Sequence, residues 1–483
     1  MLFIQSNSLA LPLSRGERLR LLEALARRGP APLIRTTRGR LFQTLVSRAG
    51  DAALVSRAAA ELERECAARQ ESEGEAAYTP GDLFFADDCV LTLVFGEGAE
   101  GGLRAGVVYN VSTAEPLAKL ERFCREVRGA LSEVRKADEG GAEPPADLPE
   151  WRAQAGRLSE GLARFIAVQP SEFTRAAAAL RGGRELTRAS ALMEHHEVRS
   201  FLRRVQEMRR EGYTPRRLLR ETGALGGVSV EALLGAGLLV REVRVSCRKS
   251  GHALFDLPAP DSLAAITISK AKCSQCAAPV ADEVIEETIN PSPLAVALLE
   301  DGRWLSNRVY QLVRSLGVPD SEIASGPASP HGESYLAVEV GGASFLFAAR
   351  DGDLTPAVAR RVAERVEEAD ASHLVVVTTG AAEDEGRLRL YEFAWRRARD
   401  GRDLGTTLVE GLEGARAQIE RAFAAAVQRE LSRGLFTLDA ALGFSAARFV
   451  LDWFRLAQTP GEKKGAAELP APPRADLDRQ VAS

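Results

Sequence analysis

Apolar residues recur along most of the chain at the spacing of either a helix or a strand. Near the N-terminus, a first helix is expected after the capping-box pattern at Ser14, and a second over 51–70. Two short apolar runs follow, Cys89–Phe95 and Arg104–Asn110, which are typical of strands. The pattern therefore predicts an N-terminal α/β unit over residues 1–134.

A stretch rich in proline, glycine and acidic residues interrupts this pattern at 135–150 and predicts a linker. Beyond it the apolar spacing is mainly helical, with one helix expected over 196–211 and a strand-like run at Leu238–Val245. The order of helix, short helix, third helix and strand resembles a winged helix-turn-helix. Residues 151–246 are therefore predicted to form a helical, winged-helix-like unit.

Strand and helix patterns then alternate over residues 290–400. Two strand-like runs, Tyr335–Val340 and Ser344–Ala349, meet at a pair of glycines. A helix is expected after Thr355, and the apolar run His373–Thr379 predicts another strand. This order of strand, strand, helix and strand predicts a small α/β sandwich.

The end of the chain differs from this unit. Residues 401–458 are expected to be helical, and the Pro-, Gly- and charge-rich segment 459–483 is expected to be disordered. With 483 residues, 45% hydrophobic and 27% charged, the chain is long enough for about two to four domains and has a globular composition. The predicted fold class is multidomain, with α+β and α/β units.

The overall charge limits the choice of partners. A net charge of −4 gives no general attraction to nucleic acid, so any such contact needs a local basic patch. No apolar run approaches the ~18 residues of a membrane helix, and the first residues lack the pattern of a signal peptide. No membrane partner is expected, and the cytoplasm is the expected location.

Three of the six cysteines and one of the five histidines lie within about 30 residues of one another near the middle of the chain. Cys273 and Cys276 have the spacing that lets two thiolates reach one tetrahedral ion. Cys247 begins a second, imperfect knuckle, in which Ser250 stands at the expected cysteine position and His252 is the expected substitute. The segment 247–285 resembles a zinc ribbon of the kind found in nucleic-acid-associated and regulatory proteins. The predicted ligands of a structural zinc ion are Cys247, His252, Cys273 and Cys276. The alternative is a ribbon that has lost a ligand at Ser250 and folds without metal.

Arginines give the unit 151–246 a local positive field in an otherwise acidic protein. They are Arg203, Arg204, Arg209, Arg210, Arg216, Arg217 and Arg220. Such a patch fits the phosphates of DNA, which position a protein without specifying a sequence. The alternatives are a solvated helix face and a module that binds other proteins.

The segment from the helix at 305–316 to the strand ending at Thr379 carries a further resemblance. Its order, with Phe345–Asp353 between two apolar strands, is similar to the restriction-endonuclease-like core of archaeal Holliday-junction resolvases and the Mrr group. In that family an acid on the first strand and an E-x-K motif on the second hold a divalent metal. Here Ala348-Ala349-Arg350 stands in the E-x-K place, and Tyr335 falls near the expected first acid. The resemblance therefore implies a nuclease-like core without its signature carboxylate.

Three functions remain open at this point. The leading hypothesis is a non-catalytic, DNA-associated protein with a structural zinc ribbon. The first alternative is an active Mg²⁺-dependent nuclease whose site has migrated to Glu339, Asp351 and Asp353, although Asp-Gly-Asp before a helix is also ordinary turn chemistry. The second is a scaffold that contacts only proteins. The unit 1–134 has no interpretable motif and is the candidate for recruiting a protein partner.

Overall fold

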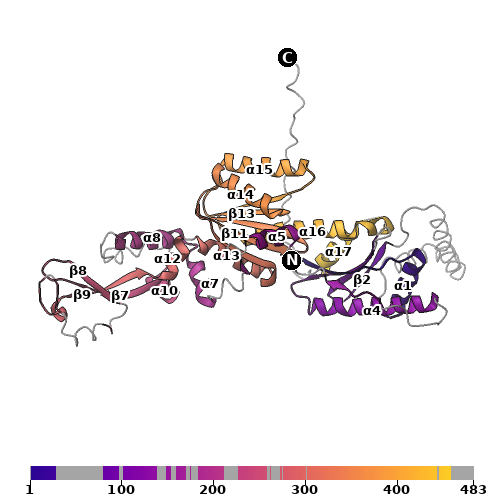
Figure 1. Cartoon of the computed structure of the whole chain (residues 1–483), viewed down its shortest axis with the longest axis horizontal. Coiled ribbons are helices and arrows are strands. Elements are labelled where there is room, and N and C mark those ends of the chain that lie inside the picture. The colour runs from indigo at the N-terminus through magenta and orange to yellow at the C-terminus, as the bar shows by residue number, and fades with distance from the viewer. Residues whose placement is uncertain are drawn as a thin grey trace, which may run out of the picture.

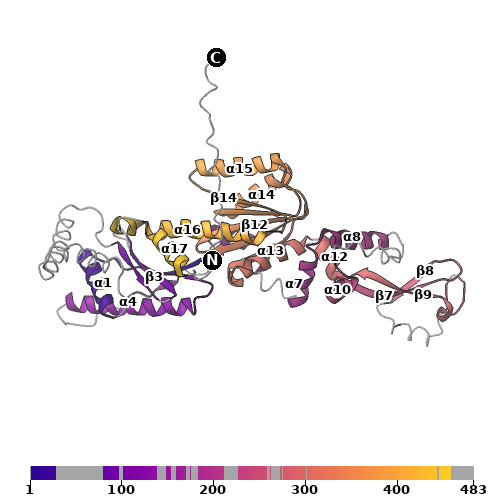
Figure 2. The same cartoon turned by 180° about the vertical axis from the view of Figure 1, so that it is seen from behind.

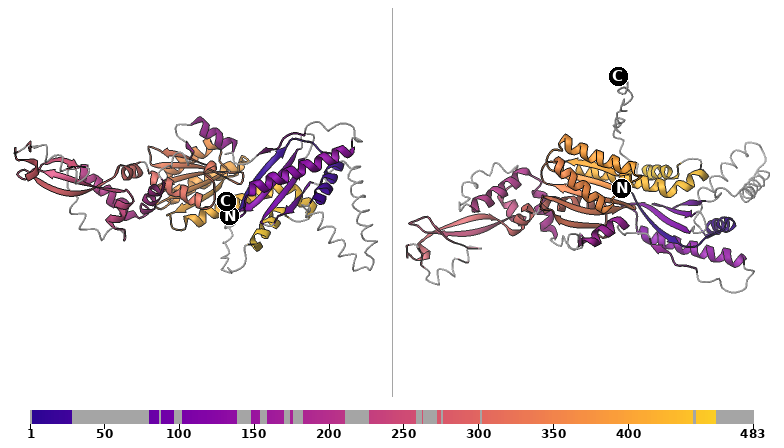
Figure 3. Two further views of the ribbon diagram at one scale, coloured as in Figure 1. Left: turned by 90° about the horizontal axis from the view of Figure 1, so that it is seen from below. Right: turned by 45° about the horizontal axis from the view of Figure 1, so that its top comes forward.

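Three β-sheets follow one another along the long axis of the molecule, with helices between and over them (Figure 1). The structure is a computed structural model, and its views from behind and from below show the same three parts in line (Figures 2 and 3). The architecture is mixed α/β and multidomain. The residues that the structure describes are 2–28, 80–86, 88–96, 102–138, 148–153, 159–169, 174–175, 183–210, 227–257, 262, 272–274, 276–300, 302–442 and 445–457.

The N-terminal sheet has the strand order β2-β3-β4-β1-β5, and neighbouring strands are antiparallel. Its strands are β1 (Leu2–Leu9), β2 (Gly81–Phe85), β3 (Cys89–Phe95), β4 (Leu103–Asn110) and β5 (Arg152–Ala153). Helices α1 (Arg15–Arg28) and α4 (Pro116–Asp138) cover one face, where Phe84 packs against Phe123. The other face meets the C-terminal helices, since Phe85 contacts Phe449 and Trp453. Every residue of β3 is buried because both faces are covered.

The central sheet has the order β14-β13-β12-β11-β10-β6. Its strands are β6 (Thr174–Arg175), β10 (Ile323–Ala328), β11 (Glu333–Val340), β12 (Ala343–Arg350), β13 (His373–Thr378) and β14 (Gly405–Glu410). The β10, β11 and β12 neighbours are antiparallel, whereas β12, β13 and β14 are parallel.

Helices cover both faces of the central sheet. One face carries α5 (Glu160–Val168), α14 (Pro356–Ala369) and α15 (Asp384–Arg399). The other carries α13 (Arg303–Ser315) and the long α16 (Ala415–Leu442), which continues toward the N-terminal sheet and is followed by α17 (Ala446–Ala457) (Figure 2). The helix α16 therefore joins the cores of two sheets.

The third sheet, with the order β8-β7-β9, projects from the body as an arm (Figure 1). Its antiparallel strands are β7 (Leu239–Ser246), β8 (Ala253–Leu257) and β9 (Val284–Pro291). At its base lie α7 (Gly183–Leu192), α8 (His196–Arg210), α10 (Val230–Gly235) and α12 (Pro293–Glu300). "The arm" below means these three strands and the turns at their far end.

Several sequence predictions are confirmed. The structure has β3 at Cys89–Phe95, and β4, β11, β12 and β13 lie within a residue or two of the predicted runs. The helix predicted after Thr355 begins there, because the Thr355 hydroxyl accepts a hydrogen bond from the Val358 N–H. The helix predicted over 51–70, the short-helix region at 214–226 and the tail 459–483 lie outside the described residues.

Other predictions were wrong. Residues 401–458 contain the strand β14 as well as helices, and the N-terminal unit begins with a strand, β1, before its first helix. Both strands carry several polar residues, so neither shows an apolar run. The helix α4 also extends to Asp138, into the predicted linker, since Leu131 and Val134 keep its apolar face against the sheet. None of the described helices is long and apolar enough to cross a membrane.

Candidate metal centre

Two turns at the far end of the arm have the same backbone hydrogen bonds. In the first knuckle, residues 247–252, the Cys247 N–H donates to the His252 carbonyl over 2.8 Å, and the Gly251 N–H donates to the Cys247 carbonyl over 2.8 Å. In the second knuckle, residues 273–278, the corresponding bonds run from Cys273 to Ala278, 2.7 Å, and from Ala277 to Cys273, 2.9 Å. The two knuckles are therefore structural counterparts.

The backbone conformation supports the same equivalence. Gly251 and Ala277 occupy the same place in the two knuckles and both have left-handed φ values, 69° and 57°. Glycine adopts this conformation without strain, whereas an alanine there costs energy and persists because the surrounding turn requires it. The antiparallel β pairs that flank each turn also correspond: Ser246 pairs with Ala253, and Lys272 pairs with Pro279.

This equivalence corrects the predicted fourth ligand. Ser250 is the counterpart of Cys276, and His252 is the counterpart of Ala278, which has no ligand role. His252 is exposed, and its backbone carbonyl is used by the Cys247 N–H, so the structure does not bring its imidazole to the cysteines. The spacing of residues in the sequence suggested His252, because spacing does not show which position of the turn faces the cysteines.

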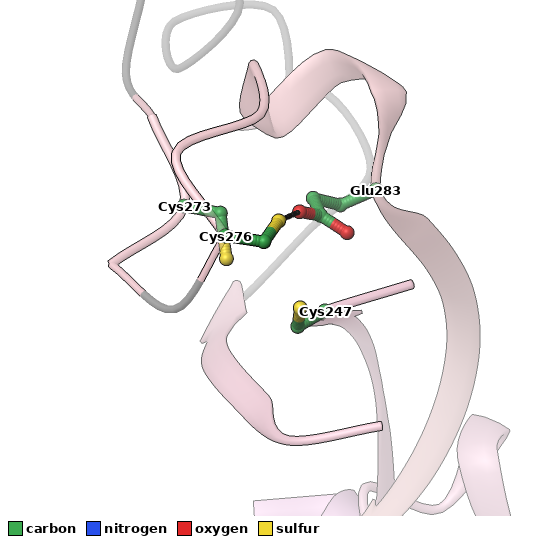
Figure 4. A group of neighbouring side chains, drawn as sticks. All are labelled: Cys247, Cys273, Cys276 and Glu283. Carbon is green, nitrogen blue, oxygen red and sulfur yellow. Dashed lines mark hydrogen bonds between the residues drawn. The ribbon is translucent and has the colours of Figure 1, made fainter. Parts of the chain in front are cut away.

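A carboxylate joins the three thiols instead. Glu283 follows the short 3₁₀ helix η2 (Val280–Asp282) and immediately precedes β9, which brings its side chain back over the second knuckle. The Sγ atoms of Cys247, Cys273 and Cys276 and a carboxylate oxygen of Glu283 all lie within 4.8 Å of one another. Figure 4 shows these four side chains converging from three segments of the arm.

All the groups of this cluster except Cys276 are buried, and each is fixed by hydrogen bonds. Glu283 is 4% exposed; one of its oxygens accepts the Arg248 N–H, and the other accepts the Cys276 thiol over 3.0 Å. That thiol donation raises the pKa of Cys276 to about 12 and lowers the pKa of Glu283. At the first knuckle, hydrogen bonds from Ser250 lower the pKa of Cys247 to about 7. The cluster therefore has one thiol, Cys247, whose ionisation is favoured, and one thiol, Cys276, that keeps its proton and donates a hydrogen bond to the ionised Glu283 carboxylate.

The donor set and its spacing fit a zinc-like ion. Around a tetrahedral ion with Zn–S bonds of about 2.3 Å, neighbouring sulfurs lie ~3.8 Å apart, which the observed cluster permits. Soft thiolates favour Zn²⁺ over Mg²⁺ or Ca²⁺, and a carboxylate oxygen is an accepted zinc ligand. Four protein ligands leave no open coordination position, which is typical of a structural site.

The predicted DNA-binding arginines do not form one described patch. Arg203, on α8, donates to Asp351 over 2.7 Å, and the neighbouring Arg204 is exposed. Arg209 and Arg210 are the last residues of α8, and their side chains lie outside the described part of the structure. The same holds for the whole of Arg216, Arg217 and Arg220.

Asp351, a candidate nuclease residue, is held by two arginines of α8 and by Thr379, which follows β13. The Thr379 hydroxyl donates over 2.8 Å, Arg203 binds the second oxygen, and Arg199 lies 3.6 Å away while stacking over Trp304. Burial opposes ionisation, but these donors outweigh it and hold the pKa of Asp351 below its usual value. Asp351 therefore joins α8 to the central sheet.

The other two candidate acids lie elsewhere. Asp353 accepts the Ala381 N–H over 2.8 Å, which joins the turn between β12 and α14 to the loop between β13 and α15. Glu339 lines a cavity of about 380 Å³ between the N-terminal and central sheets, together with Glu322 and Gln5. Burial raises the pKa of Glu339 to about 7, and the charge of Glu322 adds to the effect. The structure does not bring Glu339 to the two aspartates.

Sequence reasoning overlooked Glu333, which is 1% exposed at the start of β11. It lies directly opposite Arg350 in the β11–β12 register, and the two are 3.7 Å apart. Arg361 also binds its carboxylate, and the Ser329 hydroxyl donates over 2.5 Å. The arginine in the E-x-K place is thus one member of a buried ion cluster. In the sequence, Glu333 and Arg350 flank the two predicted strands at the end away from the Gly341-Gly342 turn, and this placement was the available clue.

Comparison of the chain with protein-family models, with curated proteins and with solved structures gave no match.

Proposed function

We propose that this chain is a non-catalytic nucleic-acid-binding protein, and that the arm, stabilised by a structural zinc ion, is part of its binding surface. The observation that carries the proposal is the convergence of Cys247, Cys273, Cys276 and Glu283 at the far end of the arm. An ion at that point fixes two turns whose exposed residues include several cations. In this proposal the segment 247–285 is a zinc ribbon that departs from the usual ligand set at Ser250.

The charge at the end of the arm supports nucleic acid as the partner. Arg248 and Lys249 lie on the first knuckle and Lys272 flanks the second, and all three side chains are exposed. On the strands of the arm, Arg241 pairs with Glu287 and Arg244 pairs with Asp256, so among the described residues the positive charge gathers at the knuckles. A small cationic tip on an acidic protein suits contact with phosphates, which gives affinity without base recognition.

Binding rather than cleavage is favoured by the environment of the candidate acids. A magnesium site needs carboxylate oxygens that are not already neutralised. Asp351 is bound by two arginines and a threonine, and Glu333 by two arginines and a serine. We therefore propose that the central unit is a nuclease-like core in which ion pairs have replaced the metal site. We further propose that the helices at the base of the arm form a winged-helix-like module.

The proposal is tested by measuring DNA binding of the zinc-loaded chain at several salt concentrations. The logarithm of the binding constant, measured by fluorescence anisotropy, should fall linearly as the logarithm of the salt concentration rises. The slope should be ~0.9 for each phosphate that the protein contacts. The triple variant Arg248→Ala/Lys249→Ala/Lys272→Ala should bind more weakly and show a shallower slope. A matched variant, Arg360→Ala, removes an exposed arginine of α14 and should leave the slope unchanged.

Two results would reject the proposal. One is the absence of binding at low salt for both duplex and single-stranded probes. The other is binding that the triple variant leaves unchanged. Incubation of plasmid with the protein and Mg²⁺ or Mn²⁺ tests catalysis separately: we expect no cleavage, and cleavage that disappears in the variant Asp351→Asn would favour a nuclease.

A further inference from the structure

Helix α15 carries an apolar stripe on the side that faces away from the central sheet. Leu388, Tyr391 and Trp395 are 56%, 59% and 61% exposed. Their spacing of three and four residues places them in one line along the helix. The inner side of the same helix buries Gly386, Leu390 and part of Phe393 against α14 and the sheet. The outer stripe therefore makes no contribution to the packing of α15 against the rest of the fold.

This concentration of exposed apolar residues occurs on one element of the described structure. The other large exposed apolar side chains there are single residues on separate elements, such as Phe436 on α16 and Val168 on α5. Tyrosine and tryptophan are enriched at the centres of protein interfaces, and contiguous apolar patches mark interaction sites. The helix forms the outermost layer of the central unit, so the stripe is open to a partner (Figures 1 and 2).

The charges on α15 indicate which partner fits. Its exposed first turn is acidic, with Asp384 and Glu385, and its last turn is basic, with exposed Arg396 and Arg399. This distribution also stabilises the isolated helix through its dipole, but the dipole does not explain an exposed apolar stripe between the charges. A second helix with the same sequence, laid antiparallel, presents its basic end to the acidic end of the first.

The residue positions agree with such a pairing. With a two-fold axis between Tyr391 and Glu392, Leu388 of one copy lies opposite Trp395 of the other. In the same register Asp384 lies opposite Arg399, and these two exposed residues continue the line of the stripe at its two ends. A parallel pairing would instead bring like charges together. A self-complementary patch of this kind is what a two-fold symmetric dimer requires.

We propose that this chain forms a symmetric dimer through antiparallel contact of α15 with α15 of a second copy. On the ordinary surface areas of these side chains, the stripe offers roughly 400 Å² per copy, below the ~800 Å² per partner of a standard interface. The dimer is therefore weak, and it depends on protein concentration. Arg399, whose guanidinium lies 4.9 Å from the Trp395 ring, holds that ring at one end of the contact.

Sedimentation equilibrium of the full chain over a wide concentration range tests the proposal. Wild type should shift from monomer to dimer as concentration rises, and Trp395→Ala or Leu388→Glu should raise the dissociation constant at least about tenfold. The matched control is Phe436→Glu, which changes a lone exposed aromatic residue on α16 and should leave the dissociation constant unchanged.

Charge reversal tests whether the two helices pair in this antiparallel register or whether the stripe binds something else. Asp384→Arg and Arg399→Asp should each weaken the dimer, whereas the double variant should restore it, because both reversed charges again face opposite ones. Circular dichroism verifies that each variant is folded. A wild type that stays monomeric at all concentrations overturns the proposal, and so does a double variant that is no better than the single ones.

Discussion

Glu283 reaches the thiols through the path of the chain rather than through a spacing motif. The 3₁₀ turn after the second knuckle reverses the chain, and β9 then runs back along β7 with Ser246 paired to Val284. That pairing sets Glu283 beside Cys247, which lies far from it in sequence. The cysteine pair at 273 and 276 was predictable because its geometry is local. The fourth group was not, because it depends on the register of two strands.

The ligand assignment leads to a first prediction, for the metal content of purified protein. Cys276→Ser and Glu283→Ala should each lower the zinc content well below one equivalent, because each removes a converging donor. His252→Ala should leave it unchanged, since His252 is the counterpart of Ala278. Ser250→Cys, which places a thiol at the counterpart of Cys276, should make zinc harder to remove with a chelator. Loss of zinc in His252→Ala would show that the imidazole is the fourth ligand.

Glu339 supports a prediction about pH. Burial, with a contribution from Glu322, raises its pKa from 4.5 to about 7. Between about pH 4.5 and pH 7 the folded state holds a proton on Glu339 that the unfolded state releases. The buried carboxylate therefore leaves the free energy of unfolding unchanged below about pH 4.5, and it lowers that free energy by its full amount above pH 7. Glu339→Gln should therefore match wild type near pH 4.5 and exceed its stability above pH 7, by on the order of 1–2 kcal/mol after discounting for partial exposure. Thermal melts across this range measure the difference, with exposed Glu364→Gln as the control. A difference that is independent of pH would contradict the assignment.

At the scale of elements, the position of α8 depends on one carboxylate. Arg199 is 5% exposed and, with Arg203, faces Asp351, while its guanidinium lies over Trp304 on α13. Asp351→Asn leaves two guanidinium groups without their anion, and breaking such a partly buried pair costs on the order of 3 kcal/mol. We expect faster hydrogen exchange in α8, with β3 in the distant N-terminal sheet unchanged. The exposed Asp403→Asn serves as control, and an unchanged exchange rate in α8 would show that Asp351 does not hold this helix.

The elements that could be predicted from the sequence are those whose burial is uniform. All residues of β13 and nearly all of β12 are buried, so their sequences are continuous apolar runs, and Thr355 marks the start of α14 chemically. The edge strand β14 and the strand β1 are both mostly half-buried and carry polar residues, so neither gives an apolar run in the sequence. The role of Arg350 was also hidden, because its partner Glu333 becomes visible only when the β11–β12 register is known.

At the scale of the whole molecule, the three sheets depend on different interactions. The N-terminal and central sheets have helices on both faces, and α16 packs against both of them. At the base of the arm, Leu238 and Leu239 belong to the core of the body. Farther out, Val243, Val245 and Val280 are buried but belong to none of the three large apolar clusters of the described residues. A small sheet with so little apolar burial needs another source of stability, and a metal ion is the usual one.

Removing the metal should therefore loosen the arm and leave the rest of the molecule folded. Hydrogen exchange of the zinc-loaded chain, compared with the chain after chelation, should accelerate at least about tenfold in the outer half of β7, in β8 and in the first half of β9. Exchange in β11, β12 and β13 should not change, because their core contains no residue of the knuckles. Cys276→Ser in the presence of zinc should reproduce the pattern, which excludes a general effect of the chelator. Equal acceleration in the central sheet would mean that the arm and the body unfold together, and no acceleration in the arm would mean that its strands are stable without the ion.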